Sequence, residues 1–197
     1  PDDTLYKRRN TLKVEYVPDD IVGRDNEIEE YEAALQPIIN GEYPDNIFIY
    51  GKTGVGKTAV TNFLLNELQE SAEHFDVDLS VISLNCDGLS TSYQAAISLV
   101  NNLREPEHHI AETGHPQSKV YRLLWDELNK FSGTVIIVLD EIDGIQEDDY
   151  VLYELPRASI DSVSIGVIGI TNDYQFHENL DADIRSSLGS REVVFSP

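Results

Sequence analysis

Residues 51–58 read Gly-Lys-Thr-Gly-Val-Gly-Lys-Thr and constrain the fold of this chain more than any other stretch. An apolar, strand-like run precedes this octapeptide, and a helical pattern with Val60, Leu64 and Leu68 on one side follows it. A phosphate-binding loop needs this strand–loop–helix context. Glycines 51, 54 and 56 permit backbone angles that a side chain would block, so successive N–H groups can turn inward around a phosphate. A glycine-rich turn without a ligand is the alternative, and the full spacing disfavours it.

The residues of the octapeptide have distinct expected roles. The positive end of the following helix adds to the attraction for an anion. Lys57 would supply a positive charge to the β- and γ-phosphates, and the Thr58 hydroxyl can ligate Mg²⁺. We therefore predict that the chain binds a nucleoside triphosphate. The predicted contacts in this loop are Gly51, Thr53, Gly54, Val55, Gly56, Lys57 and Thr58.

A second informative stretch is the apolar run at 135–139, which Asp140 and Glu141 follow directly. Five consecutive apolar residues suit a parallel strand that is buried on both faces. Open α/β sheets bind ligands at the carboxyl ends of their strands, so we expect Asp140 to assist Mg²⁺ and Glu141 to polarise the attacking water. Asn172 ends the next apolar strand at the same edge and could hold that water or the γ-phosphate; an ordinary turn is the alternative. Asp143 could either cap a turn or take part in the chemistry.

The charge of the chain is strongly negative and dispersed. Its 197 residues include 14 Lys and Arg against 36 Asp and Glu, for a net charge of −22. A dispersed acidic surface favours a protein adapted to high salt over one with a single acidic face for a basic partner. This charge argues against non-specific DNA binding by the chain as a whole. A single cysteine, Cys86, and the absence of membrane-length apolar runs favour a cytoplasmic setting without membrane contact.

The remaining periodicities predict one α/β domain at 17–197 that follows an N-terminal segment at 1–16. That segment holds the basic cluster Lys7, Arg8, Arg9 and Lys13, which is either a solvated segment or a nucleic-acid arm. The chain begins at Pro1 and ends at Pro197 without a closing helix, and we expect it to be part of a longer protein. Strands are predicted at 46–50, 79–85, 134–139, 162–170 and 192–195, and helices after 24, 57, 90, 117, 149 and 179.

Three further local features of the sequence lead to specific expectations. Pro37 is expected to kink or end the first helix. His108, His109 and His115 lie in a polar, irregular segment at 104–117; a metal site is conceivable, but surface histidines are favoured because no cysteine accompanies them. Cys86 is expected to be a small buried core residue.

The phosphate loop, the Asp-Glu pair at 140–141 and Asn172 together resemble the AAA+ ATPases. The resemblance narrows to the archaeal origin-recognition and helicase-loader initiators through residues 16–24, 83–86, 163–172 and 186–195. It implies a P-loop αβα sandwich with a five-stranded parallel sheet in the order 5-1-4-3-2. It also implies an adenine site near Val17, Ile21 and Arg24.

The resemblance also implies further domains and binding partners. In this family a helical lid and a winged-helix DNA-binding domain follow the nucleotide-binding domain, and both are absent from the 197 residues. A slow, Mg²⁺-dependent ATPase would then act as an ATP/ADP switch, with origin DNA bound mainly by the winged helix and with the replicative helicase as a partner. A nucleoid-associated location would follow.

Two departures from the family pattern qualify these expectations. An arginine is expected where Asp183 stands, so Arg185 is the candidate to reach a neighbouring subunit's γ-phosphate, with a surface salt bridge as its alternative. The insert that touches DNA in relatives carries Glu105, Glu107 and Glu112 here, which argues against direct DNA contact by this domain. A clamp-loader-like AAA+ protein and a nucleotide-gated scaffold with negligible hydrolysis are the other functions that the sequence allows.

Overall fold

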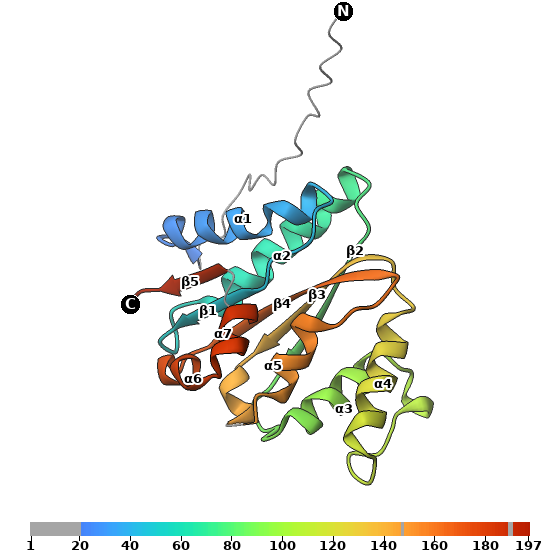
Figure 1. Ribbon diagram of the computed structural model, residues 1–197. Helices are drawn as coiled ribbons and strands as arrows, with labels where there is room; N and C mark the ends of the chain where they lie inside the picture. Colours follow the sequence, from blue (N-terminus) through green and yellow to red (C-terminus); the bar gives the residue numbers. More distant parts are fainter. Residues whose placement is uncertain (1–20, 147, 189–190) are drawn as a thin grey trace, which may run out of the picture.

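A sheet of five parallel strands forms the centre of the computed structural model, which describes residues 21–146, 148–188 and 191–197 (Figure 1). The strands are β1 (Ile47–Gly51), β2 (Leu79–Asn85), β3 (Gly133–Asp140), β4 (Val163–Thr171) and β5 (Arg191–Phe195). Their order across the sheet is β2-β3-β4-β1-β5, and every neighbouring pair is parallel. This order confirms the predicted 5-1-4-3-2 arrangement. From the adjacent strands β1 and β4 the chain leaves toward opposite edges of the sheet, and ligands bind at such switch points.

Helices cover both faces of the sheet, as the sandwich prediction requires (Figure 1). One face packs against α1 (Asp25–Ile39) and α2 (Lys57–His74). The opposite face packs against α3 (Ser92–Asn102), α4 (Gln117–Leu128), α5 (Tyr150–Glu154), α6 (Tyr174–Asn179) and α7 (Ala182–Leu188). Short 3-10 helices are η2 (Pro106–His108), η3 (Ile142–Ile145) and η4 (Leu155–Arg157). Within the described ranges, no helix is both long enough and apolar enough to cross a lipid bilayer.

The central strand β3 connects the two halves of the core. Its side chains alternate between the faces, because successive residues of a strand point in opposite directions. Ile136 and Val138 pack with α1 and α2, whereas Ile137 and Leu139 pack with the helices of the other face. This burial on both faces confirms the interpretation of the apolar run, and it holds the acidic end of β3 at a fixed position.

The local predictions were mostly confirmed, with two exceptions. Thr91 caps α3 by accepting a hydrogen bond from the Gln94 N–H, and Cys86 is fully buried. Pro37 was expected to kink or end the first helix, and it does not end it, because α1 continues two residues further to Ile39. The backbone hydrogen bond that a proline cannot donate is lost only in the last turn, where the helix tolerates it. The six-residue helix α6 was not predicted, since it is too short for a clear apolar period.

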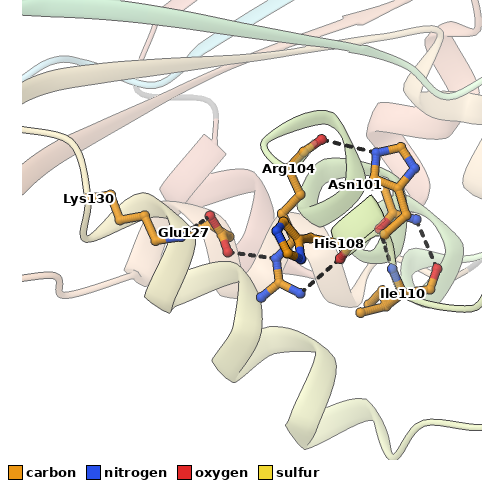
Figure 2. Close-up of polar contacts among 7 residues, drawn as sticks. Asn101, Arg104, His108, Ile110, Glu127 and Lys130 are labelled. Atoms are coloured by element: carbon orange, nitrogen blue, oxygen red, sulfur yellow. Dashed lines mark hydrogen bonds and ion pairs between the residues drawn. The ribbon is translucent and has the colours of Figure 1, made fainter. Parts of the chain in front are cut away.

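The polar segment between α3 and α4 is tied to both helices (Figure 2). Asn101 donates to the Ile110 carbonyl and accepts from its N–H, at 3.1 and 2.8 Å. Glu127 of α4 is buried and accepts from Arg104 Nε at 2.6 Å and from Lys130 Nζ at 2.8 Å. Its carboxylate therefore joins the start of the segment to the end of α4.

The three histidines of this segment differ in how exposed they are. His108 and His109 are exposed, and His115 is partly buried. The described residues contain no group of three or more His, Cys, Asp or Glu that could hold a metal ion.

Candidate nucleotide site

The glycine-rich loop connects β1 to α2, as its sequence predicts. Gly54 and Gly56 have φ angles of +83° and +89°, in the left-handed region that L side chains rarely adopt. Gly51 is needed for a different reason from the one expected: its φ is not positive, but a Cβ there would lie 2.6 Å from the Phe195 carbonyl oxygen. Close approach of β5, and not an unusual backbone angle, therefore requires a glycine at position 51.

The Lys57 ammonium lies within this loop. Its Nζ donates hydrogen bonds to the Gly51 carbonyl at 2.7 Å and to the Lys52 carbonyl at 2.9 Å, and the residue is 8% exposed. Burial lowers the pKa of Lys57, and the nearby carboxylates of Asp140 and Asp143 act in the opposite direction. The loop thus holds a positive charge at the bottom of the pocket described below.

The two predicted Mg²⁺ residues meet across the sheet edge. Thr58 Oγ1, in the first turn of α2, donates to Asp140 Oδ2 at the end of β3 over 2.7 Å. Hydroxyl and carboxylate oxygens are the donors that Mg²⁺ prefers, so this pair fits the ion. The two residues are 82 positions apart in the sequence, and their bond joins the first turn of α2 to the end of β3.

Glu141 stands beside this pair in a strained conformation. Its φ of +50° is unusual for a residue with a side chain and costs about 1–2 kcal/mol. Its N–H donates to Asp140 Oδ1 at 2.8 Å. Burial, together with the negative charges of Asp87, Asp140 and Asp143, raises the pKa of the Glu141 carboxyl, while a hydrogen bond with Asn85 opposes the shift. A raised pKa and a position in a pocket are features of a general base.

Asn172, which directly follows β4, lines the other side of the site. Its Nδ2 donates to Thr53 Oγ1 in the glycine-rich loop at 2.8 Å. The predicted loop, the acidic pair and Asn172 therefore converge on one pocket of about 340 Å³. The lining residues are Thr53, Gly54, Gly56, Lys57, Thr58, Ala59, Asp140, Glu141, Ile170, Thr171 and Asn172.

Five of the predicted site residues that the structure describes do not line this pocket: Ile21, Arg24, Gly51, Val55 and Arg185. Ile21 is 3% exposed in the core beside α1. Arg24 donates to Glu27 Oε1 at 2.9 Å and to the Ser196 carbonyl. Arg185 is 40% exposed on α7, and its nearest ion-pair partner, Glu178, is 3.9 Å away. Val17 lies outside the described residues, and Val55 is partly buried and packs against the core.

Sequence reasoning missed two groups of residues, one that lines the pocket and one that acts on Glu141. Ile170 and Thr171 line the pocket from the end of β4. Asn85, the last residue of β2, and Asp87, just beyond it, influence Glu141. The sequence did hold a signal for these residues, namely their position at the end of a strand. Parallel strands bring their carboxyl ends to one edge of the sheet, so polar residues after any predicted strand are candidate site residues.

The model of the AAA domain family matches residues 40–173, which include every residue that lines the pocket. The chain belongs to this family. ORC1-type DNA replication protein 2 of Haloarcula marismortui is 79% identical across this whole chain, which covers 48% of that relative. The ORC1-type DNA replication protein of Thermococcus kodakarensis is 35% identical over 98% of the chain and is likewise 48% covered. The chain thus spans about half the length of the curated relatives it matches.

Solved structures of archaeal proteins are similar to this chain as well. The Aeropyrum pernix ORC1 protein in complex with DNA superposes with a TM-score of 0.78 at 35% identity, over 97% of this chain and 50% of that one. A second, the Aeropyrum pernix ORC2 protein in its ADPNP-ADP complexes, has a TM-score of 0.72 at 21% identity and shows the shared fold. These matches confirm the resemblance to archaeal origin-recognition proteins. Haloarchaeal relatives support the expected salt-adapted source.

Proposed function

We propose that this chain is the ATP-binding and ATP-hydrolysing domain of an initiator of DNA replication. The observation that carries the proposal is the convergence of Lys57, the Thr58–Asp140 pair, Glu141 and Asn172 on one pocket at the carboxyl edge of the sheet. These are the cation, the metal-ligand pair, the base and the polar amide that phosphoryl transfer to water requires.

Each of these residues has a distinct chemical task. The N–H groups of residues 52–57 and the Lys57 ammonium would bind the β- and γ-phosphates, exchanging the carbonyl partners of Lys57 for phosphate oxygens. Thr58 and Asp140 would hold Mg²⁺, which would neutralise charge on the phosphates. Glu141 would take the proton of the attacking water, and Asn172 would orient that water or the γ-phosphate.

Relatives favour an initiator over a clamp-loader-like protein or a passive scaffold. The proteins that match over nearly the entire chain are named ORC1-type DNA replication proteins, and the Aeropyrum pernix ORC1 structure contains DNA. On this basis ATP and ADP would switch the conformation of the longer protein, which would bind origin DNA largely outside these residues and help to load the replicative helicase. The proposed location is the cytoplasm, in association with the nucleoid.

Self-association through Arg185 belongs to the same proposal. The guanidinium is partly exposed on α7 and is held by one carboxylate at the limit of an ion pair. Such a side chain is free to leave Glu178 for a phosphate of a neighbouring subunit at little cost, because exposed ion pairs of this kind contribute less than about 1 kcal/mol.

The test is nucleotide-dependent DNA binding by the product of the complete gene. Fluorescence anisotropy with duplex DNA from a replication origin should give different affinities with ATP and with ADP, and Thr58→Val should remove the difference. Equal affinities with both nucleotides, in a protein that binds both, would contradict the switch.

A further inference from the structure

A hydrogen bond joins two elements of the site for which the proposed mechanism assigns no role. Thr171 Oγ1, at the end of β4, donates to Asp143 Oδ1, in η3, at 2.6 Å. Thr171 is 1% exposed and Asp143 is partly buried, so solvent competes weakly for this bond. The bond therefore joins the residues that follow β3 to the end of the neighbouring strand.

On the β4 side, this bond shares the Thr171 hydroxyl with the turn that carries Asn172. The Thr171 oxygen that donates to Asp143 also accepts from the Asp173 N–H at 3.0 Å. Asn172 lies between these two residues, and its amide reaches Thr53 in the phosphate loop. Loss of the Asp143 acceptor would let the Thr171 hydroxyl rotate, which would weaken the turn that aims Asn172.

On the β3 side, the same bond holds the corner that carries Glu141. The strained Glu141 backbone leads directly into η3, where the Gly144 N–H donates to the Glu141 carbonyl at 2.9 Å. Gly144 is packed so closely that a Cβ would lie 2.2 Å from the Cys86 carbonyl oxygen. A strained conformation persists only where its surroundings enforce it. The Asp143 carboxylate supplies a side-chain hydrogen bond from this corner to β4.

We propose that Asp143 is a positioning residue for ATP hydrolysis, which through Thr171 holds the base Glu141 and the amide of Asn172 at a fixed separation. This inference rests on the proposed function. It assigns Asp143 no contact with the phosphates or with Mg²⁺. The pair acts on the rate of the chemical step and leaves the binding of ATP to the phosphate loop.

The variants Asp143→Ala and Thr171→Val each remove one partner of the bond, and Thr171→Val preserves the shape of the side chain. Asp143→Asn retains an oxygen that can accept from Thr171, so it tests whether the acceptor is enough. Asp181→Ala is the matched control, since Asp181 lines the same surface pocket as Asp143, whereas the bond to Thr171 is made by Asp143. Single-turnover hydrolysis gives the rate, and calorimetry gives the ATP affinity.

The two bond-breaking variants should lower the hydrolysis rate about ten- to hundred-fold, as small misplacements of reacting groups do, with the ATP Kd changed less than about two-fold. The double variant should be no slower than the slower single variant, because both remove the same bond. Asp143→Asn and Asp181→Ala should stay close to the wild-type rate. Unchanged rates in the single variants, an equal loss in Asp181→Ala, or Kd values that rise in step with the rates would overturn the proposal.

Hydrogen exchange on the same proteins without nucleotide separates this inference from the proposed function. The amides of residues 171–173 should exchange faster in Asp143→Ala than in the wild type, because local opening becomes easier. Unchanged exchange overturns the positioning role. A wild type that binds no ATP contradicts the proposed function instead.

Discussion

Replacing Glu141 by glutamine tests the assignment of the base. The side chain keeps its shape, and its amide can still hydrogen-bond to Asn85, but it can no longer accept a proton from water. The neighbouring carboxylates are not placed to substitute for it, since Asp87 and Asp143 do not line the pocket. Asp140 accepts from Thr58 and from the Glu141 N–H, and Asp143 accepts from Thr171.

The size of the expected effect follows from these contacts. A positioned general base contributes about 10²–10⁴-fold to a rate, or about 2.7–5.4 kcal/mol of transition-state stabilisation. Since Asp140 and Asp143 are engaged in hydrogen bonds and Asp87 lies outside the pocket lining, Glu141→Gln should lose at least the lower value. The ATP affinity should stay the same or rise slightly, because a negative charge beside the phosphates is removed.

Single-turnover hydrolysis, with protein in excess over labelled ATP, measures this rate directly. Glu107→Gln is the matched control, because Glu107 is exposed in η2 outside the pocket. If Glu141→Gln and the wild type hydrolyse ATP at equal rates, Glu141 is not the base.

Three further predictions concern the pH dependence of hydrolysis, the buried Glu127 carboxylate and the glycine at position 51. Because the pKa of Glu141 is raised, the base is protonated and hydrolysis slows as pH falls through that pKa. Asp87→Asn should move this acidic limb of the pH–rate profile to lower pH, and an unmoved limb would contradict the cause given. Glu127→Gln should destabilise the domain by about 1–3 kcal/mol in urea unfolding, since two charge-assisted hydrogen bonds are weakened at a buried site, and a variant as stable as the wild type would refute this. Gly51→Ala should cost about 1–3 kcal/mol by forcing β5 away from β1, and unchanged unfolding would show that the strands adjust freely.

The phosphate loop and the acidic end of β3 could be predicted because their chemistry is local. The spacing of residues 51–58 between an apolar strand and an amphipathic helix leaves few alternatives, and a five-residue apolar run followed by Asp140 and Glu141 has a clear place in a parallel sheet. The strand order, in contrast, came from the resemblance to a family, since periodicity does not determine which strands pair.

The missed features depend on contacts between segments that are distant in sequence. Thr171 and Asp143 are 28 residues apart, and their bond exists because β3 and β4 are neighbours whose ends lie side by side. The contacts of Arg24, which was expected near adenine, likewise join distant segments: it lies between Glu27 and the chain after β5. The reason for a glycine at 51 likewise became visible only once β5 was placed against β1.

The most direct test of the account is isothermal titration calorimetry of ATP with Mg²⁺ on the wild type and on Lys57→Ala. The Lys57 ammonium is the buried cation of the loop, and a charge-assisted contact of this kind is worth about 1.5–3 kcal/mol. Lys119→Ala removes the same charge from an exposed position on α4 and serves as the control. The account predicts that Lys57→Ala binds ATP about ten- to hundred-fold more weakly while Lys119→Ala binds like the wild type. Equal affinity in all three proteins would contradict it.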